Sequence, residues 1–259
     1  MIIDSKVVLI TGASQGIGAA CAREFRKRGA RLSLTARSED RLKALAGADD
    51  VVTAGDLTDA EIRSRAVDRT LERFGVIDIL INNAGIGMYA PAWKAPLEEV
   101  HRMFELNFFA PLAMIQLVAT HMRGRKSGMV VNIGSIAGKT TLPWFTLYSA
   151  TKFALGALTE GLRMELANDG VRTMIVCPGY VNTDFQSHAL AGRPPDRLLK
   201  GKKFAITAEQ CAEAVARGVE RDARTVVTPA IGWALIAAQR LFPRVVEAQM
   251  RKIYQSVVQ

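Results

Sequence analysis

A single α/β domain, built on one doubly wound parallel sheet, is the fold that this sequence predicts. Short apolar runs typical of strands alternate with longer helical patterns, and a glycine-rich turn joins the first run to a helix. A third observation is size, because 259 residues with 49% hydrophobic content suffice for one large core. Such alternation is typical of parallel strands joined by right-handed helical crossovers, the Rossmann arrangement. No repeat or linker divides the chain, so we expect one domain over residues 1–259.

The expected elements alternate along the whole chain. About seven strands are expected, near residues 6–10, 31–35, 51–54, 78–81, 129–134, 172–177 and 225–228. Helices are expected between them, near residues 16–28, 59–74, 97–122, 147–168 and 207–221. The strand-like runs are rich in apolar and β-branched residues, as is usual for parallel strands that are buried on both faces.

The first strand leads directly into a turn that is rich in glycine. Its sequence is Thr11-Gly12-Ala13-Ser14-Gln15-Gly16-Ile17-Gly18, and an alanine-rich helix follows. Glycines let a backbone approach a pyrophosphate, and the free amides of a helix start point toward it. The spacing G-x-x-x-G-x-G differs from the commonest dinucleotide fingerprint. The turn stands at the end of the first strand of an alternating pattern, which favours a nucleotide site over a plain turn.

Tyr148 and Lys152 form the most informative pair of side chains. They stand four residues apart, so on a helix they share one face. An ammonium beside a phenol favours the phenolate, and a phenol of lowered pKa can exchange a proton with a carbonyl or alcohol oxygen. Ser135, thirteen residues upstream, is placed to hold the same oxygen. The alternative is a solvated surface pair, although Tyr148 alone of the four tyrosines has a lysine four residues later.

With these residues, the chain resembles the classical short-chain dehydrogenase/reductase family over almost its whole length. The glycine-rich turn matches the family's cofactor turn, and Asn82-Asn83-Ala84-Gly85 matches the signature after the fourth strand. Asn107, Ser135, Tyr148 and Lys152 match its catalytic tetrad. The segment 178–183 (PGYVNT) matches the part that holds the nicotinamide. Many members have two serines where this chain has Gly134-Ser135, but the functional serine is kept.

The resemblance implies a role for each matched residue. Tyr148 would exchange the proton, Ser135 would steady the developing alkoxide, and Lys152 would bind the nicotinamide ribose and lower the phenol pKa. The backbone at Asn107 would hold a water that links Lys152 to solvent. In the glycine-rich turn, the cofactor would contact Gly12, Ser14, Gln15, Gly16, Ile17 and Gly18. Near the adenine it would contact Asp56 and Leu57, and beside the ribose Asn83, Ala84 and Gly85. At the nicotinamide it would contact Pro178, Gly179, Val181 and Thr183, together with Tyr148 and Lys152. Residues of about 185–205 would form a flap over the substrate.

The residues after the second strand predict NADP(H) as cofactor. An NAD-selecting site typically has a carboxylate there to bind the ribose 2′-hydroxyl. This chain has Arg37 instead, whose planar fork suits a phosphate, and Ser38 offers a second contact. Gln15 is a departure, because many NADP-preferring relatives have a second basic residue near that turn position. The alternative is an ordinary surface arginine.

Charge and composition limit the other classes. The net charge is +9, but no clustered nucleic-acid module is present, so no nucleic-acid partner is expected. Three scattered cysteines suit a reduced, cytoplasmic protein, and no metal-ligand spacing is present. The first strand begins within six residues of Met1, which leaves no room for a signal peptide. The flap holds a basic cluster that either favours an anionic substrate, carrier or membrane surface or is simply solvated: Arg193, Arg197, Lys200, Lys202 and Lys203.

Two apolar stretches of the sequence are candidates for contact with a partner. Residues 106–122 contain no Asp, Glu, Lys or Arg but include Asn107, so a subunit interface in a homodimer or homotetramer is expected rather than a membrane span. The apolar and basic segment of about 230–259 is expected to cover the substrate pocket or a dimer seam; the alternative is peripheral contact with a membrane.

The sequence therefore predicts an NADP(H)-dependent oxidoreductase acting on a small-molecule carbonyl or secondary alcohol, with a lipophilic ketone or alcohol as the favoured substrate. A 3-oxoacyl thioester on an acidic carrier is the alternative substrate. A catalytically silent NADP-binding sensor and a membrane-surface protein are the alternatives of another class.

Overall fold

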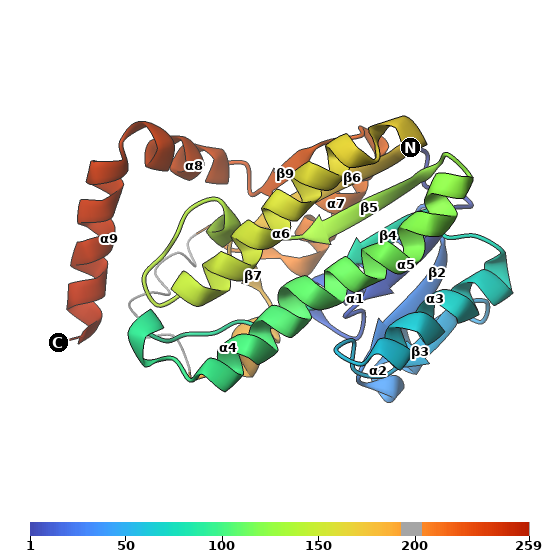
Figure 1. Ribbon diagram of the computed structural model, residues 1–259, viewed down its shortest axis with the longest axis horizontal. Coiled ribbons are helices and arrows are strands. Elements are labelled where there is room, and N and C mark those ends of the chain that lie inside the picture. The colour runs from blue at the N-terminus through green and yellow to red at the C-terminus, as the bar shows by residue number, and fades with distance from the viewer. Residues whose placement is uncertain (193–203, 259) are drawn as a thin grey trace.

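The computed structural model describes residues 1–192 and 204–258. Its main sheet contains seven parallel strands in the order β3-β2-β1-β4-β5-β6-β9 (Figure 1). Their bounds are β1 Val7–Thr11, β2 Arg31–Ala36, β3 Val51–Ala54, β4 Ile79–Asn82, β5 Gly128–Ile133, β6 Val171–Pro178 and β9 Thr225–Thr228. Each lies within two residues of the range expected from the sequence. The order reverses between β1 and β4, and at such a point the carboxyl ends of the strands open a crevice.

Helices cover both faces of this sheet. The first face is packed by α1 (Gly16–Lys27), α2 (Glu39–Leu45) and α7 (Ala208–Glu220), the second by α3 (Ala60–Phe74), α5 (Ala110–Gly124) and α6 (Thr146–Glu165). Strand β1 shows why the core has two halves: Val8 and Ile10 contact the first set, while Leu9 contacts the second. Side chains alternate between faces along a strand, so an all-apolar strand is buried on both sides.

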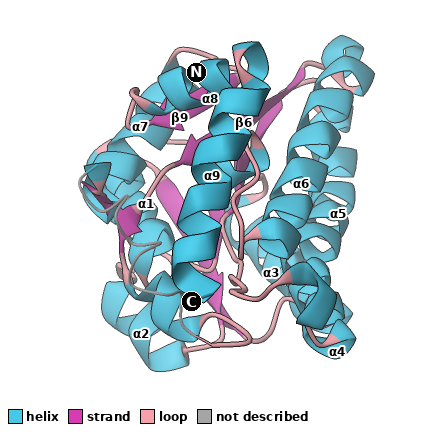
Figure 2. Cartoon of the chain, turned by 90° about the vertical axis from the view of Figure 1, so that its left-hand side faces the viewer, coloured by secondary structure: helices cyan, strands magenta, loops and turns pink. Residues whose placement is uncertain are grey.

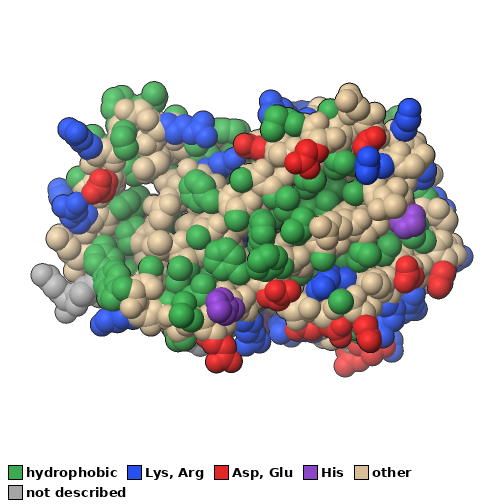
Figure 3. Space-filling view, in the orientation of Figure 1, with side chains coloured by type: hydrophobic (Ala, Val, Ile, Leu, Met, Phe, Trp, Pro, Cys, Tyr) green, Lys and Arg blue, Asp and Glu red, His purple; other side chains and the backbone are tan. Residues whose placement is uncertain are grey.

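The helix expected near 97–122 has an interruption in its middle. It consists of α4 (Leu97–Phe104), a π-helical turn (Glu105–Phe109) and α5. The whole stretch Leu97–Gly124 is long and apolar enough to cross a membrane by length and composition, but Met114, Ile115 and Val118 pack on the sheet. Its outer side is apolar too: Phe109 is 50% exposed, and on neighbouring α6 Phe153 is 42% exposed. Hydrophobic side chains gather in the middle of this face of the molecule (Figure 3).

The C-terminal segment forms two helices at one end of the molecule. Helices α8 (Gly232–Leu241) and α9 (Pro243–Val258) stand to the left of the sheet in Figure 1, and Figure 2 shows α9 in front. Ile236 anchors α8 in a small cluster with Leu155 and Val227. Strands β7 (Val181–Asn182) and β8 (Ile206–Thr207) make a separate two-stranded pair. The sequence did not predict α2, α8, α9 or this pair.

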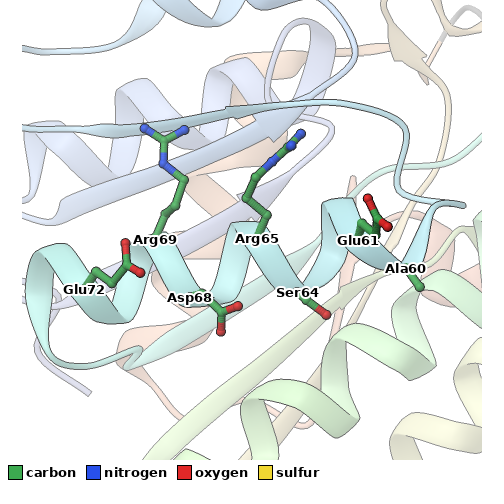
Figure 4. A pocket seen from close by; sticks show the side chains of 7 residues that line it. All are labelled: Ala60, Glu61, Ser64, Arg65, Asp68, Arg69 and Glu72. Atoms are coloured by element: carbon green, nitrogen blue, oxygen red, sulfur yellow. The ribbon is translucent and has the colours of Figure 1, made fainter.

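The edge strand β3 is closed by arginines of α3. Arg69 donates a hydrogen bond to the carbonyl oxygen of Val52 (2.6 Å), and Arg65 donates one to the carbonyl oxygen of Ala54 (3.1 Å). Both side chains rise from the same side of the helix, beside a shallow surface hollow (Figure 4). Charged side chains on an edge strand discourage pairing with another chain.

Candidate active site

The glycine-rich turn is packed tightly against the loop that follows β4. Gly12 adopts φ +64°, and a Cβ there would lie 2.8 Å from Cα of Ala84. A Cβ on Gly18 would overlap the carbonyl oxygen of Gly12. Gly12 therefore needs glycine for both its backbone conformation and its surroundings, because only glycine adopts a positive φ at little cost. This close approach forms the cradle expected from the sequence, at the start of α1.

Asn83 and Thr11 hold the turn in place. The hydroxyl of Thr11 accepts hydrogen bonds from the backbone N–H groups of Asn83 (2.9 Å) and Ala84 (3.1 Å). The side-chain amide of Asn83 donates to the carbonyl oxygens of Thr11 and Gly12, at 3.0 and 3.1 Å. The Asn83 amide, expected from the resemblance to lie beside the ribose, thus braces the phosphate turn itself. Thr11 was not recognised as a brace from the sequence, because its partners lie about seventy residues away.

Tyr148 and Lys152 lie one turn apart in the first half of α6, and both are buried. The relative exposure is 8% for Tyr148 and 5% for Lys152, so the pair is not a solvated surface pair. The Lys152 Nζ lies 5.8 Å from the centre of the Tyr148 ring and donates a hydrogen bond to the carbonyl oxygen of Ile133 (2.9 Å). Ser135 follows β5, and its hydroxyl lies close enough to Tyr148 to act on the phenol pKa. The structure therefore brings Ser135, Tyr148 and Lys152 together.

The pKa values correct one expectation from the sequence. Burial raises the pKa of Tyr148 to about 12, although the hydrogen bond with Ser135 acts in the other direction. Burial also lowers the pKa of Lys152 to about 8. In the free protein, the phenol pKa thus moves opposite to the direction expected for Lys152 acting together with a bound cofactor cation. Spacing alone suggested an acidifying ammonium, but burial penalises every charged form and Lys152 is itself buried.

Asn107 occupies the π-helical turn and joins three elements. Its Oδ1 accepts from the N–H of Ile86 (2.9 Å), and its Nδ2 donates to the carbonyl oxygen of Ile86 (2.9 Å) and to Oγ1 of Thr151 (3.1 Å). The residue is completely buried. A Cβ on Gly85 would lie 3.1 Å from Oδ1 of Asn107 and 3.6 Å from Nζ of Lys152. Asn107, Gly85 and Lys152 are therefore neighbours, and π-helical turns are frequent at functional sites.

The residues expected near the adenosine lie at the ends of β2 and β3. Arg37 is exposed and comes directly after β2, and Ser38 stands before α2 without a capping hydrogen bond from its hydroxyl. Asp56 accepts from the backbone N–H and the hydroxyl of Thr58, at 3.0 and 2.9 Å. The Leu57 side chain is buried in the core, which leaves its backbone as the group able to meet a ligand.

Aromatic and apolar side chains pack around the Tyr148 ring. Phe185 lies 5.8 Å and Phe145 6.4 Å from Tyr148 between ring centres, and Tyr89 lies 4.5 Å from Phe145. Met88 and Met103 belong to the same cluster. Phe185 is held by the segment 178–183, because Thr183 Oγ1 accepts from the N–H of Phe185 (3.4 Å). A Cβ on Gly16 would contact Thr183, so this segment lies beside the glycine-rich turn.

Some candidates were missed from the sequence or lie outside the described residues. Tyr180 donates to Oε1 of Gln186 (3.2 Å) near this cluster, and Arg41 donates to Oε1 of Gln15. No spacing rule links such residues, since the contacts depend on how loops meet. The basic flap cluster at 193–203 lies outside the residues that the structure describes.

A cavity of about 440 Å³ lies between the C-terminal helices and the loops that precede α4 and α6. Its lining includes Trp93, Trp144, Gln239, Met250 and Tyr254. Gln239 Oε1 accepts from the hydroxyl of Thr140 (3.4 Å), and Trp93 contacts Tyr254 with ring centres 6.2 Å apart. The C-terminal segment therefore lies against the loop that leads to Tyr148.

The residues present suit a bound dinucleotide. The glycine cradle lets a pyrophosphate approach the start of α1, where the helix has no acidic residue in its first turn. The buried pair Tyr148 and Lys152 lies beside Gly85, in the loop that packs on this turn. An extended ligand can thus contact phosphate-binding amides at one end and proton-exchanging groups at the other.

Comparison with known proteins gives matches to one family over most of the chain. The family model for short chain dehydrogenase matches residues 6–193. The protein "11-beta-hydroxysteroid dehydrogenase-like 2" of Arabidopsis thaliana is 31% identical over 265 residues, covering 98% of this chain and 83% of that one. A short chain dehydrogenase/reductase from Burkholderia phymatum, solved with NAD, has a TM-score of 0.83 at 26% identity and covers 96% of both chains. A short chain dehydrogenase from Burkholderia cenocepacia, solved with NADP, has a TM-score of 0.82 at 27% identity, covering 96% of this chain and 99% of that one.

Proposed function

This chain belongs to the short-chain dehydrogenase/reductase family, and from that premise we propose that it is an NADP(H)-dependent oxidoreductase that interconverts a lipophilic carbonyl compound and its secondary alcohol. One observation carries the proposal: the buried Tyr148 side chain lies beside Ser135 and one helical turn from Lys152, and Lys152 lies close to Gly85 in the loop that packs on the glycine-rich turn. Because all three groups are present and adjacent, a catalytically silent sensor is disfavoured.

Each residue has a task that its position supports. The phenol of Tyr148 donates a proton to the substrate oxygen in reduction and accepts it in oxidation. The hydroxyl of Ser135 donates a hydrogen bond to the same oxygen and stabilises its developing negative charge. When bound, the nicotinamide supplies or accepts the hydride at the substrate carbon. The raised pKa keeps the Tyr148 phenol protonated in the free protein, which suits a proton donor.

Lys152 and Asn107 support the proton transfer. A protonated Lys152 favours the phenolate left behind after transfer, since opposite charges nearby stabilise each other. With its pKa lowered to about 8, Lys152 exchanges protons close to neutral pH. Asn107 fixes the backbone of Ile86 and the hydroxyl of Thr151, and Thr151 in turn donates to the carbonyl oxygen of Tyr148 (2.7 Å). Asn107 therefore positions the first turn of α6.

The choice of NADP(H) rests on the end of β2. Arg37 is exposed there, and no carboxylate occupies the adjoining position Ser38. A guanidinium binds a phosphate through charge-assisted hydrogen bonds, whereas a site for NAD typically has an acid that would repel it.

The choice of a lipophilic substrate rests on the surroundings of Tyr148. Phe145 and Phe185 are half-buried and provide aromatic contact surface, with the fully buried Met88 and Met103 packed in the same cluster. Pockets of this kind bury apolar ligands and leave orientation to a few polar groups. The alternative, a 3-oxoacyl thioester on an acidic carrier, depends on the basic residues at 193–203, outside the described part of the chain.

The reaction is tested by NADPH oxidation with a panel of ketones, aldehydes and acyl thioesters. We expect turnover of bulky apolar ketones, and we expect Tyr148→Phe to lose about 100- to 10,000-fold in kcat, which is the usual contribution of a general acid. The variant should keep NADPH affinity, because the ring remains. Substantial carbonyl reduction by Tyr148→Phe, or turnover of thioesters alone, would contradict the mechanism or the substrate class respectively.

A further inference from the structure

Two arginines near the end of β2 have no acidic partner among the described residues. Arg37 follows the strand, and Arg41 lies one turn further on, in α2; both are exposed. The arginines of neighbouring α1 differ, because Arg23, Arg26 and Arg28 all form ion pairs with carboxylates. Unpaired cations on adjacent turns create a local positive potential that attracts a multiply charged anion.

The guanidinium of Arg41 contacts the glycine-rich turn. Its Nη1 donates a hydrogen bond of 2.5 Å to Oε1 of Gln15, in the glycine-rich turn. Gln15 occupies the cap position of α1, yet its side chain makes no capping hydrogen bond and instead reaches toward Arg41. Because the partner is a neutral amide, the charge of Arg41 stays available. The contact draws the guanidinium to the turn where the pyrophosphate would lie.

Among the described residues, neither acidic residue at the start of α2, Glu39 or Asp40, forms an ion pair with Arg37 or Arg41. Glu39 forms an ion pair of 2.8 Å with Lys43 on the same helix, so its carboxylate is already matched. Ser38 lies between Arg37 and α2, and its hydroxyl makes no capping hydrogen bond. Arg37, Ser38 and Arg41 thus lie within five residues at the carboxyl end of β2, where the adenosine ribose is expected to bind.

We propose that Arg41, held by Gln15, is a second ligand of the cofactor's 2′-phosphate beside Arg37. The proposal rests on the proposed use of NADP(H) and adds a specificity residue to it. Gln15 stands where many NADP-preferring relatives have a basic residue. In this chain Arg41 of α2 brings a cation to that position. A phosphate monoester carries between one and two negative charges near pH 7 and has three acceptor oxygens, so it can engage both guanidinium groups.

Equilibrium binding tests the role of Arg41 without any turnover. Dissociation constants are measured by calorimetry for NADPH, NADH, 2′,5′-ADP and 5′-AMP with the wild type, Arg41→Ala and Gln15→Ala. We expect Arg41→Ala to weaken NADPH and 2′,5′-ADP about tenfold or more, as for loss of a hydrogen bond to a charged group, with less than about twofold change for NADH and 5′-AMP. Lys27→Ala is the control, since it removes an exposed cation at the end of α1 that lies far from Gln15.

Gln15→Ala separates positioning from direct contact. Its effect should be smaller than that of Arg41→Ala, about threefold on 2′,5′-ADP, and should vanish when Arg41 is already alanine, because only coupled residues are non-additive. Equal losses for NADPH and NADH in Arg41→Ala, or no loss at all, would overturn the proposal.

The wild type and Arg37→Ala together distinguish failure of the proposed NADP(H) use from failure of the proposed role of Arg41. If the wild type binds 2′,5′-ADP no better than 5′-AMP, the proposed use of NADP(H) fails and the role of Arg41 falls with it. If the wild type prefers 2′,5′-ADP, loses this preference in Arg37→Ala and keeps it in Arg41→Ala, the Arg41 proposal alone is refuted.

Discussion

At the scale of single residues, the titration of Tyr148 and Lys152 follows from burial. The phenol pKa rises to about 12 and the ammonium pKa falls to about 8, so the two values move apart. Between these values both groups are neutral in the free protein; below pH 8 Lys152 is a buried cation whose hydrogen-bond partner is the carbonyl oxygen of Ile133. The free energy of unfolding therefore depends on pH through this pair.

Burial of Lys152 lowers the free energy of unfolding more at neutral pH than at high pH. Its pKa is lower in the folded protein than the ordinary 10.5, so the unfolded chain binds more protons between pH 8 and 10.5. Burial of the cation thus costs stability fully below pH 8, and the cost disappears as pH rises to 10.5. Tyr148 acts later and oppositely, since its raised pKa stabilises the fold below pH 10 and that contribution is lost toward pH 12.

Lys152→Met should therefore raise the free energy of unfolding at pH 7 by about 1–2 kcal/mol, as when a buried charge gives way to an apolar group. The gain should shrink between pH 8 and 10.5, while carbonyl reduction is lost. Urea unfolding at four pH values measures the gain. Lys27→Met, at an exposed position, is the control and should show no such pH dependence. A gain in Lys152→Met that does not vary with pH would contradict the assigned cause.

Sequence could predict which residues meet at the site but not how they titrate. The four-residue spacing placed Tyr148 and Lys152 on one helix face, and the resemblance to the family placed Ser135 beside them. Burial is a property of the whole fold, so the direction of the phenol pKa shift in the free protein could not be predicted from the sequence. The contact between Gln15 and Arg41 was missed for a related reason, because it joins two helices across 26 residues.

At the scale of elements, strands were easier to predict than short helices. A strand such as β1 is apolar at every position because both faces are covered, and this run is visible in the sequence. Helix α2 has seven residues with Leu42 alone buried, so it has no apolar periodicity to read. The π-helical turn at Asn107 was hidden because its cause is long-range: the Asn107 amide bonds to Ile86.

Edge strand β3 gives a prediction at this scale. In Arg65→Ala/Arg69→Ala the carbonyl oxygens of Val52 and Ala54 lose their donors. We expect a loss of about 1–2 kcal/mol, as for two exposed hydrogen bonds, together with greater self-association through the uncovered edge. Chemical unfolding and light scattering measure both effects. Glu72→Ala on the same helix is the control; if it matches the double variant, the edge contacts are not responsible.

At the scale of the whole molecule, the apolar face over α5 and α6 is the best surface for a second copy of the chain. Phe109 and Phe153 are large and exposed there, and large exposed apolar patches mark interaction sites. An isologous contact between two copies would bury the same patch on both. Helix α8 offers a competing surface around Trp233, which is 48% exposed at the other end of the molecule.

We expect a homodimer or homotetramer in solution, and Phe109→Glu/Phe153→Glu should lower the oligomeric state, because carboxylates in an apolar contact are costly to desolvate. Size-exclusion chromatography with light scattering gives the mass. Trp233→Glu is the comparison and should leave the mass unchanged. If Trp233→Glu alone dissociates the protein, the C-terminal helices form the seam; a monomeric wild type would exclude both faces.

The proposed cofactor-specificity residues after β2 and the residues around Tyr148 differ in how well they tolerate substitution. Arg37 and Arg41 are exposed and make few contacts, whereas Asn107, Tyr148 and Lys152 are embedded in the core. Substitutions at the first pair are thus cheap in folding terms, and those at the second set are not. Homologues with this fold can therefore change between NADP and NAD specificity during evolution while the chemical step stays the same.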